Sequence, residues 1–136
     1  MEIVVRDYSG EDYDEVNRIL KETFGYEKSK NRDTKSYEFV GVLDNNVVGY
    51  FILNEMKDII RDFIIYHVDY VCVDEKYRSQ GIGRKMMEYA IEYAKKNKAF
   101  RLELTSSNKR VAAHKLYLSL GFEIRDSAIF RKELLW

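Results

Sequence analysis

The segment RSQGIG, from Arg78 to Gly83, has the composition of a loop that binds an anion. It lies between an apolar run that ends near Val73 and a helical pattern that begins at Gly81. Glycine has no side chain, so the backbone N–H groups of such a loop can approach a ligand closely. The first N–H groups of a helix lack partners within the helix and carry partial positive charge. The segment therefore predicts an anion site at a helix N-terminus.

Other phosphate-binding loops fit this segment poorly. The dinucleotide fingerprint G-x-G-x-x-G requires a third glycine where the sequence has Met86, and Glu103, at the distance of a ribose-binding acid, falls in mid-strand. A P-loop requires Gly-Lys followed by Ser or Thr, which the chain does not contain. Taken alone, the segment could equally be a tight turn without a ligand.

Titratable side chains are concentrated just before this loop. His67 and Asp69 are two residues apart in an expected strand, so their side chains point to the same face. Histidine changes its charge near neutral pH and suits acid–base chemistry there. Cys72 stands between Val71 and Val73, where a buried cysteine behaves as a small inert hydrophobe. A covalent Cys–His mechanism is therefore disfavoured, and no cluster of His, Cys and Asp has the spacing of metal ligands.

The periodicity of apolar residues predicts the elements that position these groups. Strands are expected at 2–6, in a hairpin spanning 36–53, at 62–73 and 99–105, and in the two short segments FEIRD and SAIFRKEL that finish the chain. Helices are expected at 11–24, 81–96 and 109–120. Ser9 fits an N-cap with Asp12 three residues later, and Gly121 fits the end of the last helix. The polar loop 25–36 is expected to contain a short helical piece.

This order of elements predicts an α/β (α+β) fold. We expect a mixed, mostly antiparallel sheet of six or seven strands with a central parallel pair and helices on both faces. Residues 62–105 form a βαβ unit, so the strands at its two ends should be parallel. Because the chain has no proline, linker or repeat, residues 1–136 are expected to form a single domain.

Charge and composition narrow the classes of partner. The 136 residues include 23 Lys and Arg against 23 Asp and Glu, so no net charge favours nucleic acid or an anionic membrane. The start MEIVVRDYSG lacks the features of a signal peptide, and the run IIRDFIIYHV is too short to span a bilayer. The single cysteine excludes an internal disulfide. We expect a cytoplasmic protein with neither nucleic-acid nor membrane partners.

Two separated motifs resemble the GNAT superfamily of N-acetyltransferases. The family pattern Q/R-x-x-G-x-G/A is matched by Arg78, Gly81 and Gly83, between a strand and an amphipathic helix. A second block, SSNKRVAAHKLYLSLGFE at 106–123, resembles the downstream motif of the family with its Asn, a helix carrying Ala and Tyr, and a closing Gly-Phe. The resemblance implies an acyl-CoA N-acyltransferase fold.

The resemblance also implies acetyl-CoA as co-substrate and a set of site residues. Backbone N–H groups of the glycine loop would hold the pyrophosphate, the strand near Val71 would bind the pantetheine arm and supply an oxyanion donor, and Asn108 would hydrogen-bond the cofactor. An N-cap of the following helix is the other interpretation of Asn108. The implied cofactor-binding residues are Val71, Cys72, Val73, Arg78, Ser79, Gln80, Gly81, Ile82, Gly83, Arg84 and Asn108.

In this family an amine attacks the thioester directly and the CoA thiolate leaves. Tyr117 matches the tyrosine that protonates the thiolate, and Asp69 matches a position that is often acidic. The general base stays open between Asp69, His67 and a chain of water molecules. The expected acceptor is the amine of a small molecule, because the chain is also similar to small members such as aminoalkylphosphonate acetyltransferases. A protein N-terminus or lysine, a non-catalytic acyl-CoA sensor, and a homodimer formed through the apolar end ELLW are the alternatives.

Overall fold

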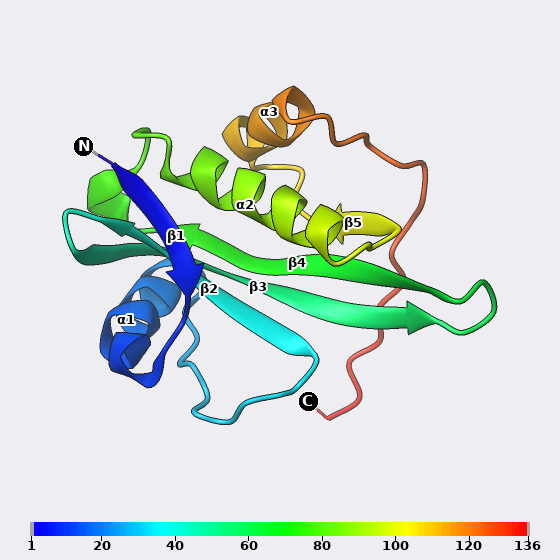
Figure 1. Ribbon diagram of the computed structural model, residues 1–136, viewed down its shortest axis with the longest axis horizontal. Coiled ribbons are helices and arrows are strands. Elements are labelled where there is room, and N and C mark those ends of the chain that lie inside the picture. The colour runs from blue at the N-terminus through cyan, green and yellow to red at the C-terminus, as the bar shows by residue number, and fades with distance from the viewer. Residues whose placement is uncertain (1, 136) are drawn as a thin grey trace. The chain divides into compact units, whose positions relative to one another are not determined.

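The computed structural model describes residues 2–135 and divides into two compact units, one that ends at Thr105 and one that begins at Ser106. The first unit contains five strands and two long helices, and the second contains one helix (Figure 1). The elements are β1 (Ile3–Asp7), η1 (Gly10–Asp12), α1 (Tyr13–Phe24), β2 (Ser36–Leu43), β3 (Asn46–Asp58), β4 (Phe63–Val73), η2 (Glu75–Tyr77), α2 (Ile82–Lys96), β5 (Arg101–Leu104) and α3 (Val111–Ser119). That the whole chain is one domain stays a prediction.

The sheet is mixed, as predicted, with the strand order β1-β2-β3-β4-β5. Strands β1 to β4 pair antiparallel, and β4 pairs parallel with β5 from Ile65↔Arg101 to Val68↔Leu104. The expected parallel pair is therefore present, but in the first unit it lies at an edge of the sheet and not at its centre.

The prediction of two strands at the end of the chain is wrong. The sheet therefore has five strands and not six or seven. No strand occurs among residues 122–135. Their alternating pattern is real, but a strand needs hydrogen bonds to a partner as well as a pattern. Apolar side chains there are exposed, with 67% of Ile129 and 93% of Phe130 accessible. Of the apolar end ELLW, Leu134 and Leu135 are exposed, and Trp136 lies outside the described residues.

Local signals set the ends of several elements. The predicted N-terminal helix begins as the turn η1, where the Asp12 carboxylate accepts the Ser9 N–H at 2.9 Å. The β2–β3 hairpin turns at Asp44 and Asn45, which both have positive φ, 51° and 66°, as a two-residue turn requires. The short helix expected within residues 25–36 is absent, and β3 runs five residues beyond its predicted end at 53.

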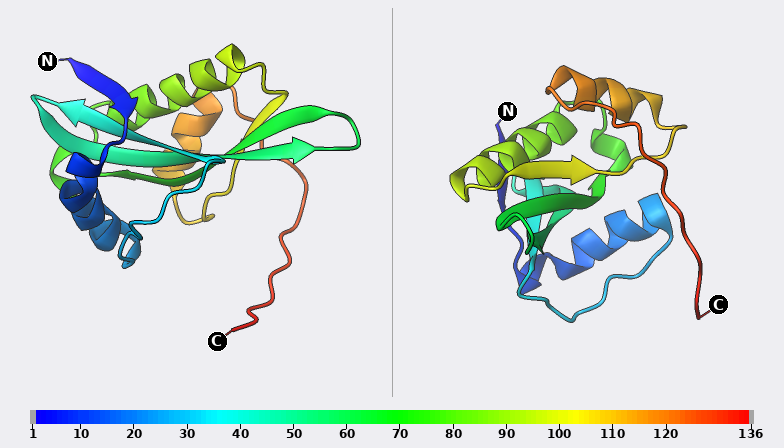
Figure 2. Two further views of the ribbon diagram at one scale, coloured as in Figure 1. Left: turned by 60° about the horizontal axis from the view of Figure 1, so that its bottom comes forward. Right: turned by 90° about the vertical axis from the view of Figure 1, so that its right-hand side faces the viewer.

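Helices α1 and α2 cover opposite faces of the sheet (Figures 1 and 2). α1 buries Val16, Ile19 and Leu20 in a cluster that includes Tyr50 of β3 and Cys72 of β4. Val16, Ile19 and Leu20 have the spacing of one helix face, and that face is turned inward. The α2 face buries five side chains of that helix, Ile82, Met86, Met87, Ala90 and Ala94.

Two glycines that pair across β2 and β3 let α2 approach the sheet. Gly41 lies directly opposite Gly49. A Cβ atom on Gly49 would lie 2.8 Å from Met86 Sδ and 3.2 Å from Ile82 Cγ2. Such distances are shorter than packed atoms tolerate, so the first turn of α2 occupies the space that the missing side chains leave.

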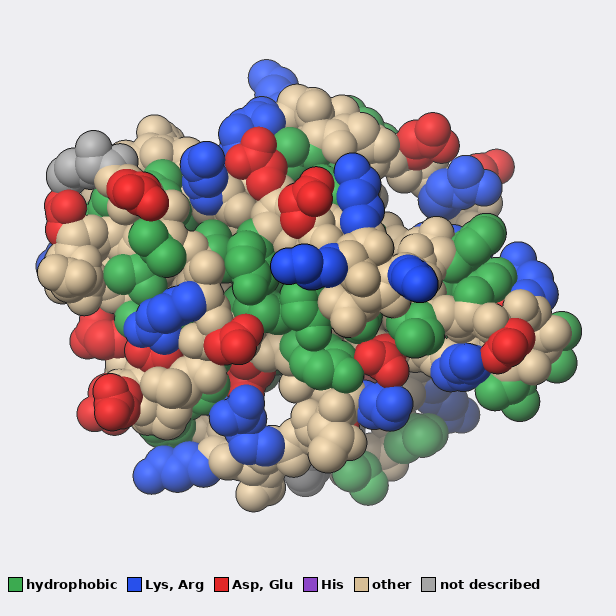
Figure 3. Space-filling model, viewed as in Figure 1, with side chains coloured by type: hydrophobic (Ala, Val, Ile, Leu, Met, Phe, Trp, Pro, Cys, Tyr) green, Lys and Arg blue, Asp and Glu red, His purple; other side chains and the backbone are tan. Residues whose placement is uncertain are grey.

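The surface carries both signs of charge. Basic and acidic side chains are interspersed on the face shown in Figure 3 and do not form one large patch. Hydrophobic side chains gather at the tip of the β3–β4 hairpin, at the right of that view, where Met56, Ile59 and Ile60 are exposed. Within residues 2–135, no helix is long and apolar enough to cross a bilayer.

We predict that Gly49→Ala lowers the free energy of unfolding by about 1–3 kcal/mol, the usual cost of forcing an extra methyl into a packed core. Urea denaturation measures the loss. Gly10→Ala is the matched control, because a Cβ there meets no atom within 4 Å. Equal midpoints for the two variants would contradict the close packing of α2 on the glycine pair.

Candidate active site

The predicted glycine loop leads directly into α2 and leaves its first N–H groups available. Ser79 and Gly81 have left-handed backbones, with φ of 64° and 88°, and Gly81 is the N-cap. The N-cap Gly81 has no side chain to cap the helix, and a backbone bond runs from Lys85 N to Gly81 O at 3.1 Å. The N–H groups of Ile82 and Gly83 precede that bond. The loop therefore offers backbone donors and a helix dipole to an anion.

A buried carboxylate holds the chain just before this loop. The side chain of Asp74 is only 4% exposed; it accepts the Lys76 N–H at 3.0 Å and the Arg18 Nη2 of α1 at 2.7 Å. Burial alone raises the pKa of Asp74, but the hydrogen bonds from Arg18 and Lys76 outweigh it, so the pKa is lowered and Asp74 stays ionised. Arg78 donates through Nε to the Val73 carbonyl at 3.2 Å. These contacts fix the path from β4 to the glycine loop.

The last part of β4 has an open edge within the first unit. Pairing with β5 ends at Val68 and Leu104, whereas β4 continues to Val73. Asp74 N–H donates to Val48 of β3 at 2.7 Å, so the N–H of Val73 points the other way, because successive residues of a strand face opposite sides. The sequence resemblance implies that the pantetheine arm pairs with this edge, and β4 has backbone groups there that no strand of the unit uses.

A β-bulge interrupts β4 beside this edge. Ile52 pairs with Asp69 and Tyr50 pairs with Cys72, so two residues of β4, Tyr70 and Val71, stand opposite one residue of β3. Tyr70 has a φ of 55°, the left-handed backbone that the bulge requires. Because of the bulge, the side chains of Asp69 and Cys72 both lie on the face of the sheet that α1 covers. Cys72 is buried in the core there, as expected for a structural cysteine.

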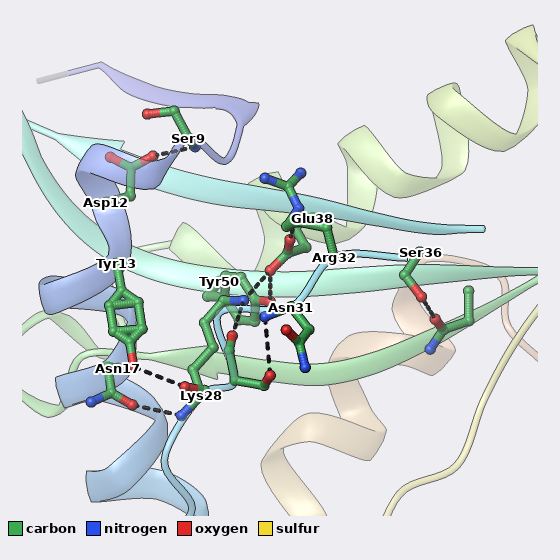
Figure 4. Close-up of polar contacts among 12 residues, drawn as sticks. Ser9, Asp12, Tyr13, Asn17, Lys28, Asn31, Arg32, Ser36, Glu38 and Tyr50 are labelled. Carbon is green, nitrogen blue, oxygen red and sulfur yellow. Dashed lines mark hydrogen bonds and ion pairs between the residues drawn. The ribbon is translucent and has the colours of Figure 1, made fainter. Parts of the chain in front are cut away.

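His67 and Asp69 belong to a row of polar side chains that crosses the α1 face. His67 Nδ1 lies 3.1 Å from Asp69 Oδ1, and Asn54 Nδ2 donates to Asp69 Oδ2 at 2.6 Å. Ser36 donates to Asn54 Oδ1 at 2.5 Å, the contact drawn at the right of Figure 4. On the other side, Thr105 Oγ1 lies 3.5 Å from His67 Nε2. His67 and Asp69 were expected from the sequence, whereas Asn54 and Ser36 were not.

The electrostatics give the two titratable groups different roles. Burial raises the pKa of Asp69, but its hydrogen bonds from His67 and Asn54 outweigh that effect, and the pKa is lowered overall. The hydrogen bond to Asp69 is the main reason that the pKa of His67 is raised above 6.5. Because Asp69 faces Nδ1, the neutral ring keeps its proton there and its lone pair on Nε2. His67 can thus accept a proton, and Asp69 orients it.

Asn108 and Tyr117 lie in the second unit. α3 begins at Val111 with Arg110 as its N-cap, so the interpretation of Asn108 as the N-cap is wrong. Tyr117 lies in α3 and makes an edge-on ring contact with Phe122 at 5.9 Å. Burial raises the pKa of Tyr117, which keeps its phenol protonated at neutral pH. Their roles stay predictions.

The fold is that of acyl-CoA N-acyltransferases. A structure of a transcriptional regulator from Bacillus halodurans superposes with a TM-score of 0.85 at 18% identity, covering 97% of this chain and 100% of that one. Ribosomal-protein-alanine N-acetyltransferase from Brucella melitensis superposes with a TM-score of 0.83 at 16% identity, covering 98% and 100%. Because the sequence identities are low, these superpositions establish only that the fold is shared.

The sequence profile of the acetyltransferase (GNAT) family matches residues 1–122, so the chain belongs to this family and is an N-acetyltransferase by class. N-acetylaspartate synthetase from Xenopus tropicalis is 32% identical over 87 residues, which are 62% of this chain and 30% of that protein. The human protein of that name is 33% identical over 84 residues, 62% of this chain and 26% of its own length. The matched region thus spans less than a third of these relatives.

We predict that the imidazole of His67 titrates above 6.5 in an NMR pH titration and that Asp69→Asn lowers its pKa. The reason is that the carboxylate stabilises the protonated ring, and the amide does not. Asp58→Asn, which changes a carboxylate on the distant β3–β4 tip, is the control and should leave the titration unchanged. His67→Gln assigns the signal. A pKa unmoved by Asp69→Asn would contradict the pairing of His67 with Asp69.

Proposed function

We propose that the chain transfers the acetyl group of acetyl-CoA directly to the primary amine of a small molecule, in the cytoplasm. One observation carries the proposal: β4 combines a His–Asp pair, an open edge and a terminus that leads into the glycine loop at the start of α2. A donor bound along that edge, with its phosphates at the loop, would reach the same strand that presents His67.

The chemistry needs a base first, because a free alkylamine has a pKa of about 10.4 and is protonated at neutral pH. His67 Nε2 takes the proton, directly or through water, and Asp69 stabilises the imidazolium that forms. The neutral amine then attacks the thioester carbonyl carbon. The oxyanion accepts a hydrogen bond from a backbone N–H between Val71 and Val73. When the C–S bond breaks, the sulfur takes the electron pair and Tyr117 supplies its proton. The nitrogen, which carries one proton too many after the attack, loses it through water and so restores the Tyr117 hydroxyl.

The loop residues would hold the donor without a metal or a positively charged pocket. The N–H groups of Ile82 and Gly83 lie at the helix N-terminus, where an anion gains about 0.3–1 kcal/mol per favourable contact from the dipole. Asn108, Arg84 and the exposed residues from Arg78 to Gln80 are further candidates for contacts to the cofactor. A small acceptor is supported by the curated relatives, whose name states an acetylated amino acid. A protein acceptor is the second candidate, and acceptor screening distinguishes the two.

We predict that acetyl-CoA binds the protein with micromolar affinity in isothermal titration and that Gly81→Trp weakens binding at least tenfold. The indole would fill the space that the pyrophosphate needs, and φ at Gly81 disfavours any side chain. Gly25→Trp is the matched control, because Gly25 also has a positive φ, 78°, and open surroundings. No binding to the unmodified protein would refute the proposed function.

We predict that Tyr117→Phe lowers kcat about 100-fold, the lower range for losing a general acid, without changing the KM for acetyl-CoA. The thiolate would then leave without a proton. Thiol release from acetyl-CoA measures the rate, and Tyr26→Phe, at a tyrosine that is 64% exposed, is the control. A Tyr117→Phe rate equal to that of the control would remove Tyr117 from the mechanism. Binding of acetyl-CoA without any turnover would favour the sensor alternative.

A further inference from the structure

A second polar cluster on the α1 face has more positive than negative charge. Glu38 of β2, whose side chain is 6% exposed, pairs with Lys28 Nζ at 2.6 Å and with Arg32 Nε at 2.8 Å (Figure 4). Tyr50 donates to the same carboxylate at 2.6 Å. Burial, and then Glu38, raise the pKa of Tyr50, so its phenol is neutral. Two cations thus share one carboxylate, and the cluster retains one positive charge.

The segment that carries these cations is fixed to α1. Lys28 N–H donates to Asn17 Oδ1 at 2.7 Å, and its carbonyl accepts the Tyr13 hydroxyl at 2.8 Å. The Lys28 ammonium also lies 4.8 Å from the ring centre of Tyr8. Its side chain is only 9% exposed. A loop without helix or strand is therefore held in one place, which is what a preorganised binding site requires.

Arg32 has donors left for a ligand. Its side chain is 56% exposed, and its Nε lies 2.8 Å from Glu38 Oε2. A guanidinium has five N–H donors, of which four are on the two terminal nitrogens. The edge formed by those nitrogens matches the two oxygens of a carboxylate or two oxygens of a phosphonate. Glu38 holds the guanidinium in place from the opposite side.

The cluster lies across the sheet from His67 and Asp69, on the same face. Glu38 pairs with Ile52 of β3, and Ile52 pairs with Asp69 of β4. Neighbouring strands are about 4.8 Å apart, which places Glu38 about 10 Å from Asp69. Ile52 lies between them on this face and packs against the core under α1. The two sites are therefore separated by the width of one intervening strand.

We propose that the acetyl acceptor is an acidic amine whose carboxylate or phosphonate binds Arg32 while its amine faces His67. This inference rests on the proposed function for the identity of the reaction. The unbalanced positive charge favours an anion, and the single strand between Glu38 and Asp69 favours a small one. The name of the curated relatives, N-acetylaspartate synthetase, denotes a product of this chemical kind.

NMR titration of the ¹⁵N-labelled protein with CoA present tests the acid site without turnover. The ligands are L-aspartate, 2-aminoethylphosphonate, and L-aspartic acid diamide, which keeps the amine but has no acid. We expect one of the two acids to bind at least tenfold more tightly than the diamide; the tighter one identifies the acidic group. Arg32→Gln should weaken that binding at least tenfold. Arg61→Gln, at an arginine that is also 56% exposed and also paired with one acid, should not.

Equal binding of acids and diamide, no binding of either acid, or full binding by Arg32→Gln would each overturn this inference. The spectrum of Arg32→Gln reports whether the variant folds, since Lys28 and Tyr50 still pair with Glu38. Thiol release from acetyl-CoA, measured with the same amines, separates this inference from the proposed function. Turnover of the diamide and the acids alike would leave the function standing and remove the acid site. Arg32-dependent binding of an acid without any turnover would support the acid site and refute the function.

Discussion

The close approach of α2 to the sheet determines where the candidate active site lies. Ile82 and Met86 occupy the space above Gly41 and Gly49, and the first turn of the helix is buried as a result. The chain that enters this buried turn has to reverse within a few residues, which the left-handed backbone at Gly81 allows. The N–H groups at the start of α2 are therefore held by packing, in place before any anion arrives. A preformed site of this kind spares the ligand the cost of ordering a loop.

Strand β4 is irregular on both edges and at its end. Next to β3 it contains a bulge at Tyr70, next to β5 its pairing stops at Val68, and at its end Asp74 ties it to α1 through Arg18. The bulge keeps Asp69 on the α1 face although the strand continues toward the glycine loop. A regular strand paired on both edges would leave no backbone N–H available beside His67. The irregularity of β4 is thus what makes the candidate site compatible with a stable sheet.

Local signals in the sequence predicted most of the fold, whereas contacts that depend on strand register could not be predicted. Helical spacing located α2, and Asp44-Asn45 located the first hairpin. The contact of Ser36 with Asn54 depends on which residues of β2 and β3 face each other, and a shift of one residue would move either side chain to the other face. Glu38 and its cations were missed for the same reason. The prediction of two final strands was wrong for a different reason. Residues 122–134 have the alternating pattern of strands, but no neighbouring strand pairs with them in the structure.

The arrangement of charge on the α1 face explains how one histidine could deprotonate an amine. The hydrogen bonds that Asp69 accepts lower its pKa and make it a weaker base than His67, whose pKa is raised. His67 is the remaining titratable group in the row, and the ordinary pKa of a histidine, about 6.5, lies well below that of an alkylammonium ion. The net positive cluster at Lys28 and Arg32 disfavours an ammonium ion on the same face, but an acid bound to Arg32 would cancel that charge. The deprotonation of an acidic amine therefore depends on the His67–Asp69 pair and not on the cations that attract its acid.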